Sequence, residues 1–298
     1  MPISFTCPFC GVETNVSDQY AGQSGPCARC GKMVTVPSPG GAPVAAASST
    51  STVLVVCLVL GGLLVAGVFV IGVLVALLLP AINVSRDAAR AAMCQNNLKQ
   101  IAMAMMQYET MHGSFPPAYL ADKDGKPMHS WRVLLLPYLD RQDLFRQYRF
   151  DEPWDGPNNR KLADKMPSIF RCPSDPDRTP STTSYMVVAG PHTMFPAKRA
   201  ISTASIRDGS SNTAMVVETV GMDVNWMEPK DLDETALEQG VVGPTGKGIG
   251  SLHRPSACVA TADTACHRLN PQISRETLRN LFDPNDGKPL DTRDAFGE

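Results

Sequence analysis

The chain has 298 residues, of which 43% are hydrophobic and 19% charged, a globular composition long enough for about two domains. Its formal net charge of −2 gives no electrostatic footprint for nucleic acid, so we expect no nucleic-acid partner. The nine cysteines do not form one set, because they fall in a cluster near the N-terminus, in an apolar run and beyond that run.

Residues 1–37 contain two Cys-x-x-Cys pairs in the pattern CPFC-x16-CARC, formed by Cys7, Cys10, Cys27 and Cys30. Two such pairs can close a tetrahedron of thiolates around Zn²⁺, so we predict a zinc ribbon. The alternative is a pair of structural disulfides. The predicted strands of this module are Ile3–Thr6, Glu13–Val16 and Lys32–Val36. Balanced charges favour a structural or protein-docking ribbon over a nucleic-acid reader.

The next segments predict a membrane anchor. Residues 38–52 are rich in Pro, Gly, Ala, Ser and Thr and predict a flexible linker. Residues 53–79 carry no charge and as a helix would span about 40 Å, enough to cross a bilayer. A buried core helix is the alternative. Flanking cations leave the orientation open, but a thiolate zinc site suits a reducing cytoplasm, which favours a cytoplasmic ribbon.

The helical pattern continues after Pro80, over Ala81–Met111. Leu98, Ile101, Met105 and Tyr108 follow a 3, 4, 3 spacing and predict one buried helical face. The helix is expected to end near His112–Gly113, because glycine accepts the left-handed cap and two prolines follow.

The rest of the chain offers little catalytic chemistry. Its five histidines are isolated, and we find no nucleophile elbow, phosphate loop or His-Glu-x-x-His helix, so we expect a protein that is not an enzyme and identify no small-molecule substrate. Residues 208–212 are rich in oxygen ligands; we expect a turn leading into a strand at Thr213–Glu218, with a Ca²⁺ site as the alternative. Ser274–Phe282 predicts a closing helix. The polar, turn-rich segment Asp283–Glu298 is expected to fray, and residues 291–298 form a polar tail.

Several segments together resemble a known family. The run from Val73 to Leu120 contains CQNNLKQ and GSFPP, and FRCPSDP, TSYMVVAG, IRDGSSNTAMVVE and SLHRPSACVATADT follow it. These segments resemble the planctomycete DUF1559 proteins over roughly residues 73–290. That resemblance implies a pilin-like outer domain, with a long helix packed on an antiparallel sheet.

The chain departs from the family pattern in two places. It lacks the Gly-Phe-Thr-Leu-x-Glu leader before the apolar helix, so we expect an uncleaved, anchored protein. In the family's His-x9-Asp-Gly element, His253 and Asp263 match but Thr264 replaces glycine, and threonine suits a hairpin turn less well. We expect His253 and Asp263 to fix a turn, with a catalytic dyad as the alternative.

The distal cysteines suggest two disulfides. Cys258 and Cys266 would lie on the two arms of that hairpin, and a Cys94–Cys172 bond would tie the long helix to the domain. Reduced, buried thiols are the alternative for all four residues.

The sequence thus predicts an α+β protein with a zinc ribbon (1–37), a linker (38–52), a transmembrane helix (53–79), a pseudopilin-like outer domain (80–290) and a tail (291–298). We expect it in the inner membrane, with the N-terminus cytoplasmic. It would act through contacts with other envelope or pilin-like proteins in secretion, surface assembly or cell-envelope organisation. The alternatives are an extracytoplasmic solute-binding module and a transmembrane sensor whose ribbon contacts a cytoplasmic partner.

Overall fold

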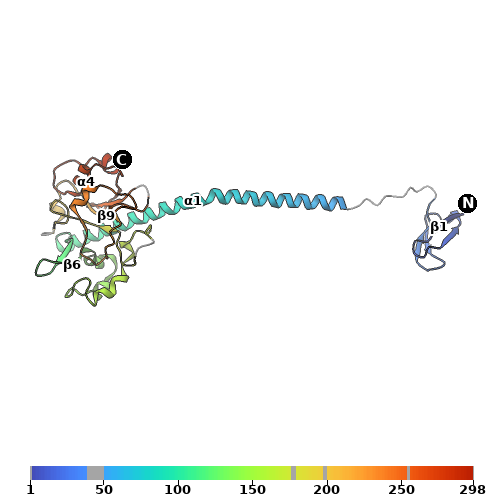
Figure 1. Ribbon diagram of the computed structural model, residues 1–298, viewed down its shortest axis with the longest axis horizontal. Coiled ribbons are helices and arrows are strands. Elements are labelled where there is room, and N and C mark those ends of the chain that lie inside the picture. The colour runs from blue at the N-terminus through green and yellow to red at the C-terminus, as the bar shows by residue number, and fades with distance from the viewer. Residues whose placement is uncertain (1, 39–49, 176–178, 197–199, 254–255, 298) are drawn as a thin grey trace. The chain divides into compact units, whose positions relative to one another are not determined.

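The computed structural model describes residues 2–38, 50–175, 179–196, 200–253 and 256–297, without the side chains of residues 50–53, 80, 81 and 83. It divides into two compact units, Met1–Val75 and Ala76–Glu298. Most of the predicted linker lies outside the described residues. Figure 1 shows the secondary structure of each unit.

The first unit begins with two antiparallel hairpins. They pair β1 (Ile3–Thr6) with β2 (Glu13–Val16) and β3 (Ser24–Pro26) with β4 (Met33–Thr35), and the 3-10 turn η1 (Asp18–Tyr20) lies between them. The first two predicted strands are confirmed with their bounds, and the third appears as β4. Strand β3 was not predicted, because Ser-Gly-Pro carries no strand signal.

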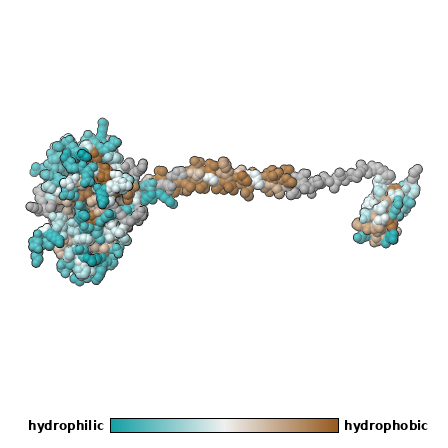
Figure 2. All heavy atoms as spheres, viewed as in Figure 1, coloured by the Kyte–Doolittle hydropathy of each residue, from teal (hydrophilic) through white to brown (hydrophobic). Residues whose placement is uncertain are grey.

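The helix α1 (Thr50–His112) begins in the first unit and is 63 residues long. Within the described part of the chain, it is the one helix long and apolar enough to cross a membrane. Its most apolar window has a mean hydropathy of 3.0 and is 0% buried. Figure 2 shows this stretch as a continuous hydrophobic surface. A surface of this kind is compatible with a membrane anchor.

The C-terminal part of α1 belongs to the second unit and changes character. Leu98, Ile101 and Met105 are fully buried and Tyr108 packs against them, which confirms the predicted face. The helix ends at His112, and Gly113 follows with a φ of 76°, the left-handed value that ends helices at low cost for glycine.

The second unit is built around an antiparallel sheet of five strands. The order is β11-β9-β12-β13, and β7 also pairs with β9. The strands are β7 (Tyr185–Met186), β9 (Ala214–Val220), β11 (Gly248–Ile249), β12 (Cys258–Thr261) and β13 (Cys266–Arg268). Every residue of β9 is buried, so it is the centre of the sheet and corresponds to the strand predicted at Thr213–Glu218.

Smaller elements surround this sheet. Two more strand pairs are β5 (Tyr119–Ala121) with β6 (Pro127–Ser130), which are antiparallel, and β8 (Val188–Ala189) with β10 (Leu232–Asp233), which are parallel. The short helices are α2 (Trp131–Leu134), η2 (Leu136–Leu139), α3 (Gln142–Gln147), η3 (Asn159–Lys165), η4 (Ser168–Phe170), η5 (Thr203–Ser205), η6 (Ser210–Asn212) and η7 (Glu234–Gln239). The parallel pair is an exception to the antiparallel sheet that we predicted.

Hydrophobic side chains of the sheet enter two separate cores. On β12, Cys258 and Ala260 pack into the core that contains the buried face of α1, whereas Val259 packs into the other core. That second core contains Leu278, Leu281 and Phe282 of helix α4 (Arg275–Phe282). The alternation is the period-2 pattern of a strand buried on both faces. The sheet therefore lies between α1 and α4.

The C-terminal region contains one helix that the sequence predicted and one that it did not. The predicted closing helix is confirmed as α4, whose N-cap Ser274 accepts a hydrogen bond from the Thr277 N–H. The fraying expected over Asp283–Glu298 is wrong for α5 (Thr292–Phe296), whose Ala295 is fully buried. Phe296 stacks on His267 at 4.4 Å between ring centroids, a contact that the polar composition of the segment conceals.

Candidate metal centre

The four N-terminal cysteines come together in the first unit. Their sulfurs all lie within 4.8 Å of one another. Cys7 Sγ is 3.9 Å from Cys30 Sγ, and Cys10 Sγ is 3.8 Å from Cys27 Sγ. With Zn–S bonds of about 2.3 Å, the edge of a tetrahedron is ~3.8 Å. The donor set and its spacing therefore fit a tetrahedral thiolate metal site.

The local backbone explains why the thiols converge. In each hairpin the chain turns directly after the second cysteine, where Gly11 and Gly31 take φ values of 69° and 72°. The Gly11 N–H donates to the Cys7 carbonyl, and the Gly31 N–H donates to the Cys27 carbonyl. Backbone N–H groups of Cys30 and Arg29 also lower the pKa of the Cys27 thiol to about 6. The turn that contains Cys27 therefore favours the thiolate form of this residue, which is the form that binds metals.

Two of the distal cysteines also meet, but in a group of four. Cys94, Cys172, Glu218 and His253 are all buried, and one ligand atom of each lies within 4.8 Å of the others. Cys94 is on α1, Cys172 follows η4, Glu218 is on β9 and His253 precedes β12. All the described cysteines are free thiols. The sulfurs of Cys94 and Cys172 are close together, and a disulfide between them stays a prediction.

The two residues of the family turn element, His253 and Asp263, contact different parts of the second unit. His253 Nε2 lies 3.2 Å from Glu218 Oε1, whereas Asp263 accepts hydrogen bonds from Thr261 Oγ1 and the Ala265 N–H within the hairpin turn. The described contacts therefore give His253 and Asp263 different partners. Thr264 takes a φ of 68°, which is the conformation that glycine would adopt at lower cost.

The hairpin also sets the relation between the last two cysteines. Cys266 is opposite Ala260 in the register, and Cys258 is opposite Arg268. Cys258 and Cys266 are thus diagonal neighbours on one face of the hairpin, since alternate residues share a face. Their disulfide also stays a prediction.

The oxygen-rich segment at residues 208–212 forms a turn before β9. Both carboxylate oxygens of Asp208 accept backbone hydrogen bonds, from Asp286 and Gly287. Gly209 has a φ of 93°, and Asn212 Nδ2 donates to the Asp208 carbonyl. These bonds assign the Asp208 oxygens to holding the C-terminal loop against the sheet.

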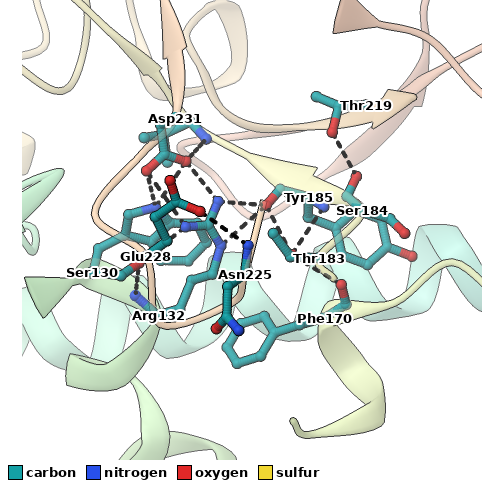
Figure 3. Close-up of polar contacts among 12 residues, drawn as sticks. Ser130, Arg132, Phe170, Thr183, Ser184, Tyr185, Thr219, Asn225, Glu228 and Asp231 are labelled. Atoms are coloured by element: carbon teal, nitrogen blue, oxygen red, sulfur yellow. Dashed lines mark hydrogen bonds and ion pairs between the residues drawn. The ribbon is translucent and has the colours of Figure 1, made fainter. Parts of the chain in front are cut away.

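The second unit also contains a buried ion pair between Arg132 and Asp231 (Figure 3). The Arg132 side chain is 0% exposed and donates through Nη2 to Asp231 Oδ1 at 2.7 Å. Its remaining donors reach Ser130 Oγ and the Tyr185 carbonyl. Asp231 also accepts from the indole N–H of Trp131 and the backbone N–H of Val187. The network fully pairs both charges, so we assign it a structural role.

Sequence reasoning missed Glu218 and Asp231 as partners of these groups. Glu218 had a signal, because it is the one charged residue in AMVVETV, a run that predicts a fully buried strand. A carboxylate in such a strand requires an internal partner. Asp231 had no comparable signal, since it lies in a polar loop segment and its partner is 99 residues away in the sequence.

Comparison with known proteins gives a match to one family model over part of the chain. No curated protein and no solved structure matches the chain. Residues 84–193 match the family model described as a protein of unknown function, DUF1559. The match covers the end of α1 and the elements to just past β8, a narrower range than the resemblance at residues 73–290 suggested. Over this segment, which is less than half of its length, the chain is similar to the DUF1559 proteins.

Proposed function

We propose that this protein is a single-pass inner-membrane protein that acts through contacts with other envelope or pilin-like proteins rather than as an enzyme. The ribbon faces the cytoplasm and the second unit lies outside it as a pseudopilin-like domain. The observation that carries the proposal is the helix α1, whose exposed apolar part and buried part belong to one continuous element.

The apolar part of α1 supports the anchor. Side chains such as Leu64 and Phe69 are 69% and 70% exposed, and no charged residue precedes Arg86 within the helix. A helix of this composition is far more stable in hydrocarbon than in water. The same helix also contributes Cys94 and Leu98 to the core of the second unit.

The four-cysteine cluster supports the orientation and the metal. We infer that Cys7, Cys10, Cys27 and Cys30 hold Zn²⁺, because four thiolates at these spacings are a closed structural set. A reducing cytoplasm keeps such thiols from oxidising. The bound ion supplies folding free energy, which a module this small requires.

The second unit supports a binding role over catalysis. The charged groups that it brings together, Arg132 with Asp231 and Glu218 with His253, are buried and engage each other. Groups placed in this way stabilise a fold and are screened from a solvent-borne substrate. Its largely polar surface suits contacts with neighbouring proteins.

Topology is tested by protease protection in spheroplasts of cells that express the chain with an epitope tag at each end. We expect the C-terminal tag to be degraded and the N-terminal tag to survive in the membrane pellet after alkaline carbonate washing. A matched variant, Leu64→Arg/Phe69→Arg, should lose membrane retention, because each buried charge costs about 2.5–3.5 kcal/mol in a bilayer. Survival of the C-terminal tag together with loss of the N-terminal tag would refute the orientation.

The contact role is tested by cross-linking intact membranes and identifying the linked peptides. We expect links from the surface of the second unit to other envelope proteins at sites that recur between preparations. Recovery of the monomer alone, together with a rise in thermal midpoint upon adding a small solute, would instead favour the solute-binding alternative.

A further inference from the structure

The strongest unexplained feature of the second unit is its buried group of two thiols, a carboxylate and an imidazole. Cys94 and Cys172 are 0% and 2% exposed, and the side chains of Glu218 and His253 are each 1% exposed. One ligand atom of each residue lies within 4.8 Å of the other three. The four residues come from four segments that are remote in sequence, so only tertiary folding assembles them.

His253 is the residue of this group whose side-chain nitrogens lack hydrogen-bond partners among the described residues. Both of its ring nitrogens are buried, and neither makes a hydrogen bond of acceptable geometry with the described residues, although Nε2 lies 3.2 Å from Glu218 Oε1. A buried polar group without such a bond costs about 1–3 kcal/mol. A metal ion would use a nitrogen of this ring as a ligand and the neighbouring carboxylate as another.

A nucleophilic cysteine and a disulfide are two alternative roles for this group, and each accounts for fewer of its residues than a metal site does. A nucleophilic cysteine needs access to its substrate, and both thiols are closed to solvent. A Cys94–Cys172 disulfide would account for the two sulfurs, but it would leave the ring nitrogens of His253 without a hydrogen-bond partner among the described residues. A metal ion accounts for all four residues at once.

The donor set indicates which metal. Two thiolates, an imidazole and a carboxylate are borderline-soft donors that suit Zn²⁺, and four protein ligands form a closed, structural site. With bonds of about 2.0–2.2 Å to nitrogen and oxygen, a tetrahedral edge is ~3.3–3.5 Å. The observed 3.2 Å between His253 Nε2 and Glu218 Oε1 is close to this length.

Neighbouring groups hold the donors in place. Ser251 Oγ donates to Glu218 Oε1, and the Cys258 N–H donates to Glu218 Oε2. The Cys172 N–H donates to Ser184 Oγ, which fixes the backbone of that ligand. Hydrogen bonds of this kind around a ligand set orient it for a metal.

We propose that Cys94, Cys172, Glu218 and His253 hold a structural Zn²⁺ ion that fastens α1 to the central strand β9 and to two loops of the second unit. The site is separate from the four-cysteine cluster. Its two thiols are closed to solvent, unlike the exposed Cys10 of the ribbon, so it does not require the reducing cytoplasm that we assign to the ribbon. The proposal gives the chain two metal sites, one in each unit.

The test is the zinc content of the full chain, expressed with zinc and purified in detergent under reducing conditions, measured by elemental analysis. We expect two zinc ions per wild-type chain and one in the variant Cys7→Ser/Cys10→Ser/Cys27→Ser/Cys30→Ser, which leaves the second unit unchanged. Adding His253→Gln to that variant should remove the remaining ion. Adding Cys266→Ser instead should leave it in place, because Cys266 lies outside the group.

Cobalt(II) provides a second readout in the four-serine variant. Thiolate-to-cobalt charge-transfer bands in the near ultraviolet should appear with one equivalent of Co²⁺ and vanish in the version with His253→Gln. The wild-type and four-serine proteins decide the question without any substitution in the second unit, so a folding defect of His253→Gln cannot mask the result. One zinc ion per wild-type chain and none in the four-serine variant would overturn the proposal, as would a Cys94–Cys172 linked peptide in the purified wild-type protein.

Discussion

The two cysteine groups occur in opposite settings. The N-terminal group lies on two short hairpins whose buried hydrophobic residues, apart from the cysteines, are Val34 and Val36. The group around Cys94 lies within a large core that α1, β9 and β12 build together. The same chemistry therefore serves different purposes: a metal would replace the missing core in the first setting and would cross-link an existing core in the second.

The largest effect should come from removing metal from the first unit. We expect Cys27→Ser, or a strong chelator, to unfold residues 3–36, because structural zinc contributes an apparent ~10–16 kcal/mol in small modules. Hydrogen exchange of the full chain should show complete loss of protection in β1–β4, while β9 stays protected. Cys57→Ser is the control, since Cys57 lies on the exposed part of α1. Retained protection in β1–β4 without metal would contradict the idea that this unit lacks a sufficient core.

In the second unit, the buried ion pair should matter more than surface pairs. Asp231→Ala leaves the Arg132 guanidinium buried without its partner, a change that typically costs ~3–5 kcal/mol. Urea denaturation followed by tryptophan fluorescence measures the loss, since Trp131 donates to Asp231. The matched control is Glu238→Ala, whose pair with Arg279 is exposed and is worth less than about 1 kcal/mol. Equal losses of unfolding free energy in the two variants would mean that burial does not determine how much an ion pair contributes to stability.

The buried face of α1 should contribute to the stability of the second unit through packing, a contribution that the small first unit lacks. Leu98→Ala removes a fully buried side chain, and we expect a loss of ~2–5 kcal/mol in unfolding free energy. Met111→Ala is the control on the same helix, because Met111 is 73% exposed and its truncation should change stability by less than about 0.5 kcal/mol. A neutral Leu98→Ala would indicate that α1 is held by something other than packing.

A stabilising change is expected at the hairpin turn. Thr264 holds a φ of 68°, and a left-handed conformation costs a residue with a Cβ roughly 1–2 kcal/mol. Thr264→Gly should therefore raise the unfolding free energy by up to about 1 kcal/mol, after allowing for the greater unfolded-state entropy of glycine. Thr264→Ala keeps the Cβ and should gain less. A glycine variant less stable than the alanine variant would rule out backbone strain at this turn.

The smallest effect concerns pH. A hydrogen bond from the Thr235 N–H holds the pKa of Asp233 below its ordinary value. Because the folded pKa is the lower one, the carboxylate contributes stability above the unfolded pKa, and this contribution is lost as pH falls through the folded value. Asp233→Asn should cost less than about 1 kcal/mol at pH 7. The difference from wild type should vanish near pH 2 in urea denaturation, and a difference that persists there would exclude the charge as its cause.

The sequence by itself determined the features that depend on local spacing. Two Cys-x-x-Cys pairs predicted the converging thiols, an uncharged apolar run predicted the exposed part of α1, and a 3, 4, 3 pattern predicted its buried face. Ser274 and the residues after it predicted α4 for the same reason, since a cap and an amphipathic turn act over a few residues.

Tertiary structure alone decided which remote residues meet. It joined Arg132 to Asp231, and it placed Glu218 and His253 beside Cys94 and Cys172, where the sequence suggested a disulfide and a separate turn element. It also ordered α5, whose Phe296 finds His267 across the C-terminal region. The physical reason is that burial of a charged or aromatic group depends on partners supplied by distant segments, and no local pattern encodes their positions.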